Sequence, residues 1–482
     1  MIDTSSAAIS FGIVAPLAAV LITAMLILLI GNVVRQKSAM MFLAVAGQIV
    51  GIFLAVQQWN NPQSGYFGLV MIDNFSVFSY IIFLTAGIIG TLMARDYLIS
   101  RGIERFEFYA MVLFSVAGMM VMVSTSDLIA IFLGLEIMSI PLYVMAGFNR
   151  RDIGSNESSI KYFMMGAFAS GFLLYGIALI YGAAETTDLR RIITDFNFIR
   201  MNSELLLLSG IFLVLFGFAF KIAAVPFHMW VPDVYEGAPT PVTAFFSVAP
   251  KAAGIAALLR IFIYGLPSIS EMIPVFWVLA VLTMTVGNLL AIFQENIKRM
   301  LAYSSIAHAG YLLVALTSGG QAAVSSALFY LLAYTFFNLG GFTVVTMIDS
   351  RTGSKALIND MKGLSKAHPF LAVILALFMF ALAGFPPTAG FFGKFYLFSS
   401  AIDNGFIWLV ILAVMNSFVS VYYYLRVVVV SFFGEAEKDF HPVSFKPALI
   451  LVLFITIAGT LLLGFFPQYC LDLARATVFP FI

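Results

Sequence analysis

Long runs of apolar residues, separated by short polar connections, recur along the whole chain. About 20 apolar residues are needed for a helix to cross a hydrocarbon core about 30 Å thick. We therefore predict an all-α polytopic membrane protein with fourteen transmembrane helices, at approximately 8–31, 39–58, 72–94, 108–125, 127–148, 159–182, 205–227, 241–264, 272–293, 299–317, 323–347, 369–402, 406–432 and 446–467. The first is interpreted as a retained helix, because it lacks a basic start and a small-residue cleavage site.

The twelfth stretch is too long for one straight helix. As a continuous helix, 369–402 would measure about 50 Å, and Pro386 and Pro387 remove hydrogen bonds in its middle. Span seven has its own interruption at Pro226, and FGFA before Pro226 resembles FMFA before Pro386. Broken helices in corresponding places of two halves are typical of inverted-repeat transporters. We predict three N-terminal helices in 1–107, a first inverted repeat (helices 4–8) in 108–264, a second (helices 9–13) in 265–434 and a last helix in 435–482.

Composition agrees with a membrane protein, because 62% of the 482 residues are hydrophobic, 10% are charged and the mean hydropathy is +1.02. The net charge of +1 argues against a nucleic-acid partner. The single cysteine, Cys470, excludes intramolecular disulfides and an iron–sulfur cluster built from this chain alone. If the N-terminus is outside, fifteen basic residues fall on cytoplasmic connections and four on the opposite side. Since basic residues favour the cytoplasmic side, we expect both termini outside.

Six basic residues fall inside or close to the predicted spans. Arg260, Arg426 and Lys161 lie within a turn or two of helix ends, where a long side chain can snorkel to the headgroups. Lys161 lies near the cytoplasmic end of its span and could also serve as a proton entry.

Four charged residues lie too deep to snorkel, namely Glu136, Lys221, Lys251 and Lys394. Glu136 follows Asp127 by nine residues, which places it about 14 Å into the bilayer. A charge there costs at least about 2.5–3.5 kcal/mol and normally marks an ion or proton path. A static ion pair between Glu136 and Lys221 would explain those two residues, but one glutamate cannot neutralise three lysines. Because a lysine in a low dielectric gives up its proton more readily, we predict a proton relay that a nearby carboxylate can switch.

Two histidines are further candidates. His308 lies mid-span in YSSIAHAGY, where the hydroxyl groups suit a water-bridged proton wire; a hydrogen-bonded core histidine is the alternative. His228, just beyond Pro226, could connect Lys221 with the cytoplasmic side. The four histidines never cluster at metal-ligand spacing, so we predict no metal site. Signatures of soluble enzymes, such as a phosphate-binding loop, are missing, so the energy must come from an ion gradient or a partner.

Four stretches carry a resemblance to a known family: FKIAAVPFHMWVPDVYEGAPTPVTAFFSVAPKAAG, GLE around Glu136, NIKRMLAYSSIAHAGY and DMKGLSKAHP. Over essentially the entire chain, the sequence resembles the subunit N family of the proton-translocating NADH–quinone oxidoreductase, respiratory complex I. The wider family also includes subunits L and M and the large subunits of sodium/proton antiporters. Fourteen spans without a long C-terminal lateral helix resemble N or M. Lys394 on the twelfth span favours N, because subunit M typically has a glutamate there.

The resemblance implies that Glu136 and Lys221 form a modulating pair, that Lys251 is the central relay, and that Lys394 belongs to a second half-channel leading outward. His308 would lie on the hydrophilic axis between Lys251 and Lys394. The chain would be a proton-translocating subunit in a bacterial inner membrane, next to subunit M and small membrane subunits. It would contain no cofactor, since FMN, iron–sulfur clusters and quinone belong to partner subunits. Two alternatives remain, a subunit of a sodium/proton antiporter and an inert membrane scaffold.

Overall fold

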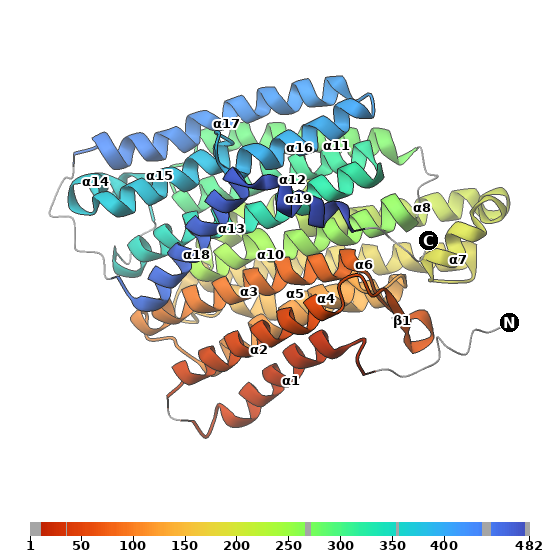
Figure 1. Ribbon diagram of the computed structural model, residues 1–482, viewed down its shortest axis with the longest axis horizontal. Coiled ribbons are helices and arrows are strands. Elements are labelled where there is room, and N and C mark those ends of the chain that lie inside the picture. The colour runs from red at the N-terminus through yellow and green to blue at the C-terminus, as the bar shows by residue number, and fades with distance from the viewer. Residues whose placement is uncertain (1–10, 35, 266–270, 353–355, 436–444, 478–482) are drawn as a thin grey trace.

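The computed structural model describes residues 11–34, 36–265, 271–352, 356–435 and 445–477. The apolar stretches fold into long helices that run side by side (Figure 1). In chain order the elements are α1 Ala15–Ile30, α2 Ser38–Gln57, β1 Gln63–Gly65, η2 Tyr66–Gly68, β2 Val70–Ile72, α3 Asn74–Ser100, α4 Phe106–Val123, α5 Leu128–Ala146, α6 Ile153–Ala184, α7 Leu189–Thr194, α8 Phe196–Ile222, α9 Trp230–Gly237, α10 Thr240–Leu259, η3 Arg260–Gly265, α11 Met272–Ile292, α12 Ile297–Ser318, α13 Gly320–Thr352, η4 Ile358–Met361, α14 Leu364–Ala367, α15 Pro369–Ala383, α16 Ala389–Asp403, α17 Ile407–Phe433, α18 Pro447–Phe465 and α19 Pro467–Arg475.

All fourteen predicted spans coincide with helices. Within the described residues, twelve helices are at least 18 residues long and apolar enough to cross a membrane. Of the two remaining spans, one is α1, which has 16 residues, and the other is formed by α15 followed by α16. The predicted fold class, an all-α polytopic membrane protein, is therefore confirmed.

The twelfth span bends where the sequence predicts. α15 ends at Ala383 and α16 begins at Ala389. Gly384 between them has a φ of +90°, a left-handed conformation that glycine adopts without strain. The residue ends α15 and turns the chain at membrane depth.

The seventh span is also interrupted, but earlier than predicted. α8 ends at Ile222, where Ala223 takes a left-handed φ of +63°, and α9 begins only at Trp230. The interruption therefore does not originate at Pro226, because the left-handed residue has already ended the helix. Lys221 consequently lies in the last turn of α8.

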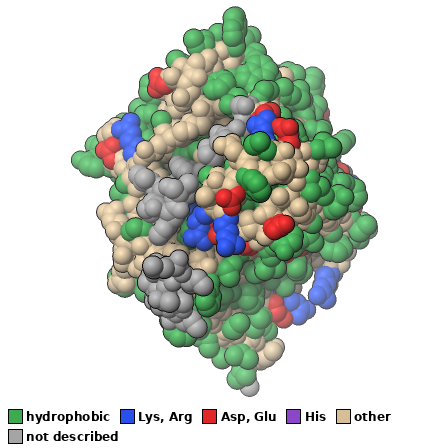
Figure 2. Space-filling model, turned by 90° about the vertical axis from the view of Figure 1, so that its right-hand side faces the viewer, with side chains coloured by type: hydrophobic (Ala, Val, Ile, Leu, Met, Phe, Trp, Pro, Cys, Tyr) green, Lys and Arg blue, Asp and Glu red, His purple; other side chains and the backbone are tan. Residues whose placement is uncertain are grey.

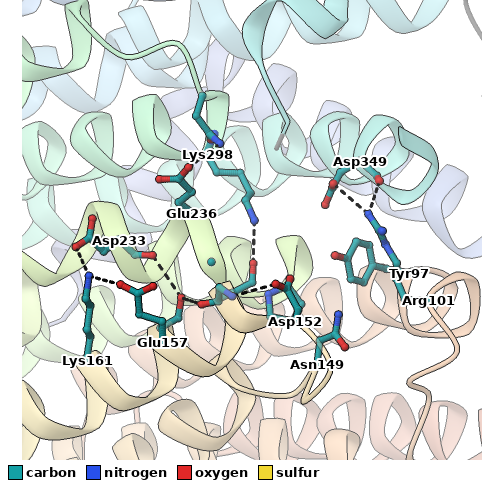
Figure 3. Close-up of a pocket in the computed structure, with 16 residues that line it drawn as sticks. Tyr97, Arg101, Asn149, Asp152, Glu157, Lys161, Asp233, Glu236, Lys298 and Asp349 are labelled. Atoms are coloured by element: carbon teal, nitrogen blue, oxygen red, sulfur yellow. Dashed lines mark hydrogen bonds and ion pairs between the residues drawn. The ribbon is translucent and has the colours of Figure 1, made fainter. Parts of the chain in front are cut away.

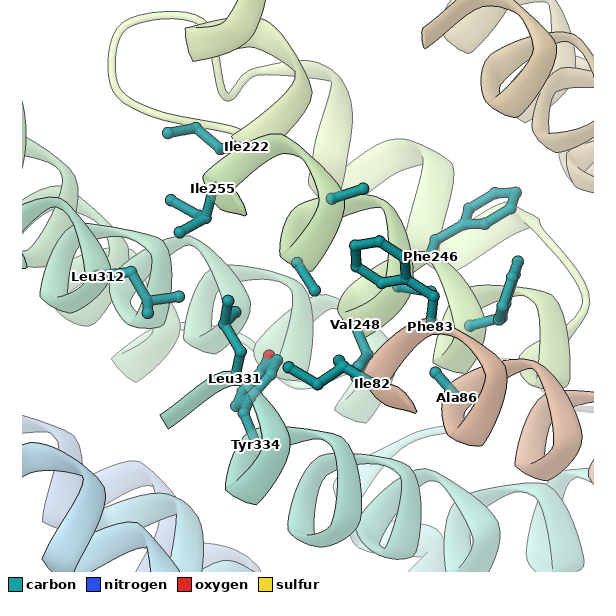
Figure 4. Packing of buried hydrophobic residues seen from close by; sticks show 14 of the residues in the cluster. Ile82, Phe83, Ala86, Ile222, Phe246, Val248, Ile255, Leu312, Leu331 and Tyr334 are labelled. Atoms are coloured by element: carbon teal, nitrogen blue, oxygen red, sulfur yellow. The ribbon is translucent and has the colours of Figure 1, made fainter. Parts of the chain in front are cut away.

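Helix α10 occupies the centre of the bundle. All twenty of its residues, from Thr240 to Leu259, are buried. Figure 4 shows Phe246, Val248 and Ile255 of this helix among side chains of α3, α12 and α13. Since Lys251 lies on α10, protein surrounds it on every side and lipid cannot reach it.

The two ends of the bundle carry different elements. The hairpin of β1 and β2 and the short helix α7 lie at one end, on the right in Figure 1, and α14 lies at the other. The end-on view in Figure 2 shows charged side chains in small groups with hydrophobic side chains around them. Arg190 and Arg200, two basic residues on the minority side of the predicted orientation, are ion-paired with Asp188 and with Glu204 and Glu271.

The prediction that Arg260 snorkels is wrong. Its side chain is 2% exposed, and Nη2 lies 3.0 Å from Oδ1 of Asp73, which is 1% exposed. Asp73 also caps α3 by accepting from the backbone N–H of Ser76. This pair joins the end of α10, where the π-helix η3 begins, to the start of α3. Arg426 likewise turns to protein, since it donates to the backbone carbonyls of Ile292 and Gln294.

Candidate functional site

Lys221 is held by two hydroxyl groups of α5. Its side chain is 3% exposed, and Nζ donates to Ser139 Oγ and to Tyr143 Oη, each at 2.8 Å. The ammonium also lies 5.1 Å from the centre of the Tyr143 ring, so the ring adds a cation–π attraction.

Glu136 lies on the same face of α5, three residues before Ser139. Its carboxylate accepts a hydrogen bond from Ser170 of α6, and it is half-buried. Among the described residues, the ion pairs within 4.0 Å include neither Glu136 nor Lys221. Lys221 of α8 thus meets the face of α5 that carries Glu136, while hydroxyl groups serve as the direct partners of both side chains.

The position of Tyr143 depends on a glycine. A Cβ at Gly166 of α6 would lie 2.2 Å from Tyr143 Oη, far inside van der Waals contact. A residue with a Cβ at this position would require the phenol to move from its present contact with Lys221.

Lys251 is the most central of the three lysines. It is 4% exposed, and Nζ donates to Ser305 Oγ of α12 at 2.5 Å. The buried hydroxyls of Tyr235 and Tyr334 lie on the same side as Ser305, and the Tyr235 ring centre is 5.8 Å from Nζ. Hydroxyl groups therefore line the surroundings of Lys251.

Helix α12 links Lys251 to Lys394 through one face. Ser305, His308 and Tyr311 recur every three residues, so they lie along the same side of the helix. His308 is 2% exposed, and its Nδ1 and Nε2 contact the hydroxyls of Tyr330 and Tyr424. A ring with a hydrogen-bonding hydroxyl at each nitrogen can take a proton on one side and release one on the other.

Lys394 sits against the break between α15 and α16. Nζ donates to the carbonyl of Ala383 at 2.9 Å and to Ser417 Oγ of α17 at 2.8 Å, and it lies 4.9 Å from the Tyr311 ring centre. The last carbonyls of a helix carry partial negative charge. The broken helix thus supplies the counter-charge for a lysine that is 5% exposed.

Lys161 lies apart from these three lysines, at a polar cavity of about 490 Å³ (Figure 3). Its Nζ is 2.7 Å from Glu157 and 2.9 Å from Asp233 of α9. The side chain is 40% exposed and ion-paired. Burial alone would raise the pKa of Asp233, but the hydrogen bonds and charges of Lys161 and Arg299 hold that pKa below its ordinary value.

His228 is not joined to the lysines. It is half-buried between α8 and α9, and its Nδ1 has no hydrogen-bond partner among the described residues. No group of three or more His, Cys, Asp or Glu side chains in the described part of the chain could hold a metal ion.

The chain is similar to known proteins over nearly its full length. The family model described as NADH:quinone oxidoreductase/Mrp antiporter, TM matches residues 125–420. NADH-quinone oxidoreductase subunit N of Trichlorobacter lovleyi is 47% identical over 473 residues, 98% of this chain and 97% of that protein. Subunit N 2 of Rhizobium meliloti is 42% identical over 458 residues, 95% of each chain.

Solved structures have the same fold. A chain of respiratory complex I from Thermus thermophilus with bound aureothin matches with a TM-score of 0.81 and 32% identity, covering 96% of this chain and 100% of that one. A chain of the Mrp complex from Dietzia sp. DQ12-45-1b matches with a TM-score of 0.83 and 22% identity, over 96% and 97% of the two chains. At that identity the second match speaks to the fold alone.

Proposed function

Since the chain belongs to the NADH-quinone oxidoreductase subunit N family, a proton-translocating membrane subunit of complex I, we propose that Lys221, Lys251, His308 and Lys394 carry its protons. Glu136 is proposed to modulate the proton affinity of Lys221, because it lies on the face of α5 that holds the Lys221 ammonium. Lys161 and the cavity beside it supply protons from the cytoplasmic side, with His228 as an accessory group.

One observation carries this proposal. Three buried lysines contact hydroxyls and backbone carbonyls, and none of them belongs to an ion pair of the described residues. Isolated charges at membrane depth are expensive, so a purely structural bundle would not contain three. Hydroxyls also donate and accept protons, which a static hydrophobic contact cannot do.

The test measures redox-linked proton uptake per electron in the assembled complex. Lys221→Ala and Glu136→Ala are each expected to lower it, and Lys251→Arg as well, because a guanidinium stays protonated. Lys366→Ala, at an exposed lysine of α14, is the matched control. Normal uptake in the first two variants, with normal assembly, contradicts the proposal and favours an inert scaffold.

A sodium/proton antiporter subunit is the second candidate, because the family model covers both kinds of protein. The 47% identity to a subunit N favours complex I. Transport in sealed vesicles separates the two, since only an antiporter requires sodium on the opposite side.

We also propose that residues 108–264 and 265–434 are inverted repeats. Gly118 packs on Gly134 and Met138, and Gly287 packs on Tyr303 and Ala307, each residue 169 positions after its counterpart. The isolated bridges Asp127 to Asp188 and Asn296 to Leu357 have the same offset. Residues 1–107 and 435–482 then flank the repeats.

The assignment to complex I extends to its surroundings. The chain is an integral membrane protein with further membrane subunits as partners. We propose that both termini are outside in a bacterial inner membrane, that subunit M and small membrane subunits are the neighbours, and that FMN, iron–sulfur clusters and quinone are held by partner subunits.

A further inference from the structure

A layer of aromatic side chains stands between the polar cavity and Lys221. Tyr162 follows Lys161 on α6, and Trp230 precedes Asp233 by almost one turn of α9. The rings of Tyr162 and Trp230 are stacked, with centroids 4.5 Å apart and an interplanar angle of 9°. Both side chains are almost completely buried. The stack therefore fills the space behind the cavity wall with two packed rings.

The inward face of α6 gives the order of the layers. Ser158 lines the cavity, Tyr162 follows one turn deeper, and Gly166 one further turn deeper faces the Tyr143 hydroxyl that holds Lys221. Four helical residues advance about 6 Å. Tyr162 thus lies between the cavity and the ammonium, and its ring centre is 5.9 Å from Lys221 Nζ.

The helices that carry the stack are also joined at the cavity by ion pairs. Asp233 of α9 lies 2.9 Å from Lys161 Nζ and 2.7 Å from Arg299 Nη1, and Arg299 reaches Glu236 of α9 at 2.9 Å. Trp230 is further anchored because its Nε1 donates to the carbonyl of Phe220 at 3.2 Å. The position of α9 therefore decides both the ion pairs and the stack.

We propose that the Tyr162–Trp230 stack is the gate between the cavity and Lys221, and that the ion pairs of Asp233 hold it closed. A displacement of α9 that parts the rings would join the water of the cavity to the Tyr143 hydroxyl. The role of the gate in proton uptake rests on the proposed function, whereas the barrier itself is a property of the packing. Besides its proposed place at the proton entry, Lys161 positions α9 through its ion pair with Asp233.

Cysteine accessibility tests the gate in the intact complex in membranes. Ser139→Cys places a thiol beside Lys221, behind the stack, and Asn149→Cys places one in the cavity as a reference. Cys470 is buried, and the parent chain measures its background. A charged, membrane-impermeant methanethiosulfonate is added to the cavity side, and the rates of labelling are compared.

In the S139C chain, Trp230→Ala is expected to raise the labelling rate of the thiol at position 139 by at least about tenfold. Loss of the Trp230 ring shifts the equilibrium of the gate toward its open form, in which the reagent reaches that thiol. Trp230→Phe, which keeps a ring, should stay near the parent rate. Asp233→Asn keeps the stacked rings and weakens the ion pairs that hold α9 in place. It should give an intermediate increase in the labelling rate. The N149C rate should remain constant in every background.

Two results overturn the gate. In the first, S139C is labelled as fast as N149C in the parent background. In the second, Trp230→Ala and Asp233→Asn both leave the labelling rate of S139C unchanged. If Trp230→Ala fails to assemble, the Asp233→Asn comparison still decides. Failure of the proposed function gives a different result. Normal proton uptake in Lys221→Ala complexes would contradict the proton relay, but it would not change the ratio of the S139C and N149C labelling rates.

Discussion

The contact between Tyr143 and Lys221 can be tested by adding a single methyl group at Gly166. A Cβ at this position would lie 2.2 Å from Tyr143 Oη and 2.7 Å from Cζ. In Gly166→Ala the phenol must therefore move, or α6 must separate from α5. The helix itself should persist, because alanine favours helix more than glycine does. We predict that Gly166→Ala displaces Tyr143 from Lys221 and lowers redox-linked proton uptake per electron.

The expected magnitude follows from two terms. Overpacking a close-packed contact costs about 1–3 kcal/mol, and losing a hydrogen bond to a charged group costs about 1.5–3 kcal/mol. The second term alone corresponds to a roughly 10- to 150-fold change in the equilibrium that places the hydroxyl beside the ammonium. Lys221 keeps its contact with Ser139 at 2.8 Å, so the site should be impaired while the ammonium retains one partner.

The assay is proton uptake per electron by the purified complex in liposomes, read with a pH-sensitive dye. Gly171→Ala on the same helix is the matched control, since nothing lies within 4 Å of a Cβ there. Combining Gly166→Ala with Tyr143→Phe removes the colliding oxygen but leaves Cζ 2.7 Å from the added Cβ, so the double variant should relieve the collision only in part and should not restore uptake. Parent-like uptake in Gly166→Ala, or an equal loss in Gly171→Ala, refutes the reasoning.

Three further predictions concern other contacts. Ser305→Ala removes the hydroxyl beside Lys251 and should lower proton uptake in the same assay, whereas Ser305→Thr should retain it. Arg260→Met leaves Asp73 buried without its ion-pair partner and should destabilise the complex by about 3–5 kcal/mol in denaturant titrations, with partial recovery on adding Asp73→Asn. Because the pKa of Asp233 is lowered in the folded chain, its stabilisation is present above the unfolded pKa of about 3.9 and is lost as pH falls through the folded value. Asp233→Asn should therefore flatten the acid-side fall in melting temperature followed by circular dichroism.

The apolar runs predict the spans well, because hydrocarbon leaves the backbone no alternative to helix. The ends of the helices are less predictable. α3 continues to Ser100 and α6 begins at Ile153, each six residues beyond the predicted span. Polar residues outside the hydrocarbon are free to remain helical, so hydropathy does not mark the last turn. The end of α8 differs from the predicted span for another reason, because Ala223 carries no sequence signal for its left-handed conformation.

The depth of the lysines predicts their burial, but their partners depend on tertiary packing. Ser139 and Tyr143, three and seven residues after Glu136, could have been recognised on one helix face. The contacts of Lys394 with Ala383 and Ser417 could not, because they depend on how α15, α16 and α17 meet. Hydrophobic patterning shows which residues turn inward, and it does not show which polar atom each one meets.

The two helix breaks give the outer lysines a different electrostatic setting from the central one. Lys221 lies in the last turn of α8, and Lys394 donates to the final carbonyls of α15. Partial negative charge at the end of α15 stabilises the Lys394 ammonium only while the break keeps its geometry. Lys251 lies on an uninterrupted helix and depends on the hydroxyl of Ser305, which can rotate without any movement of the backbone. Displacement of α15 or α16 would therefore change the stability of charge at Lys394 directly, and under the proposed function Lys251 receives the proton that such a displacement releases.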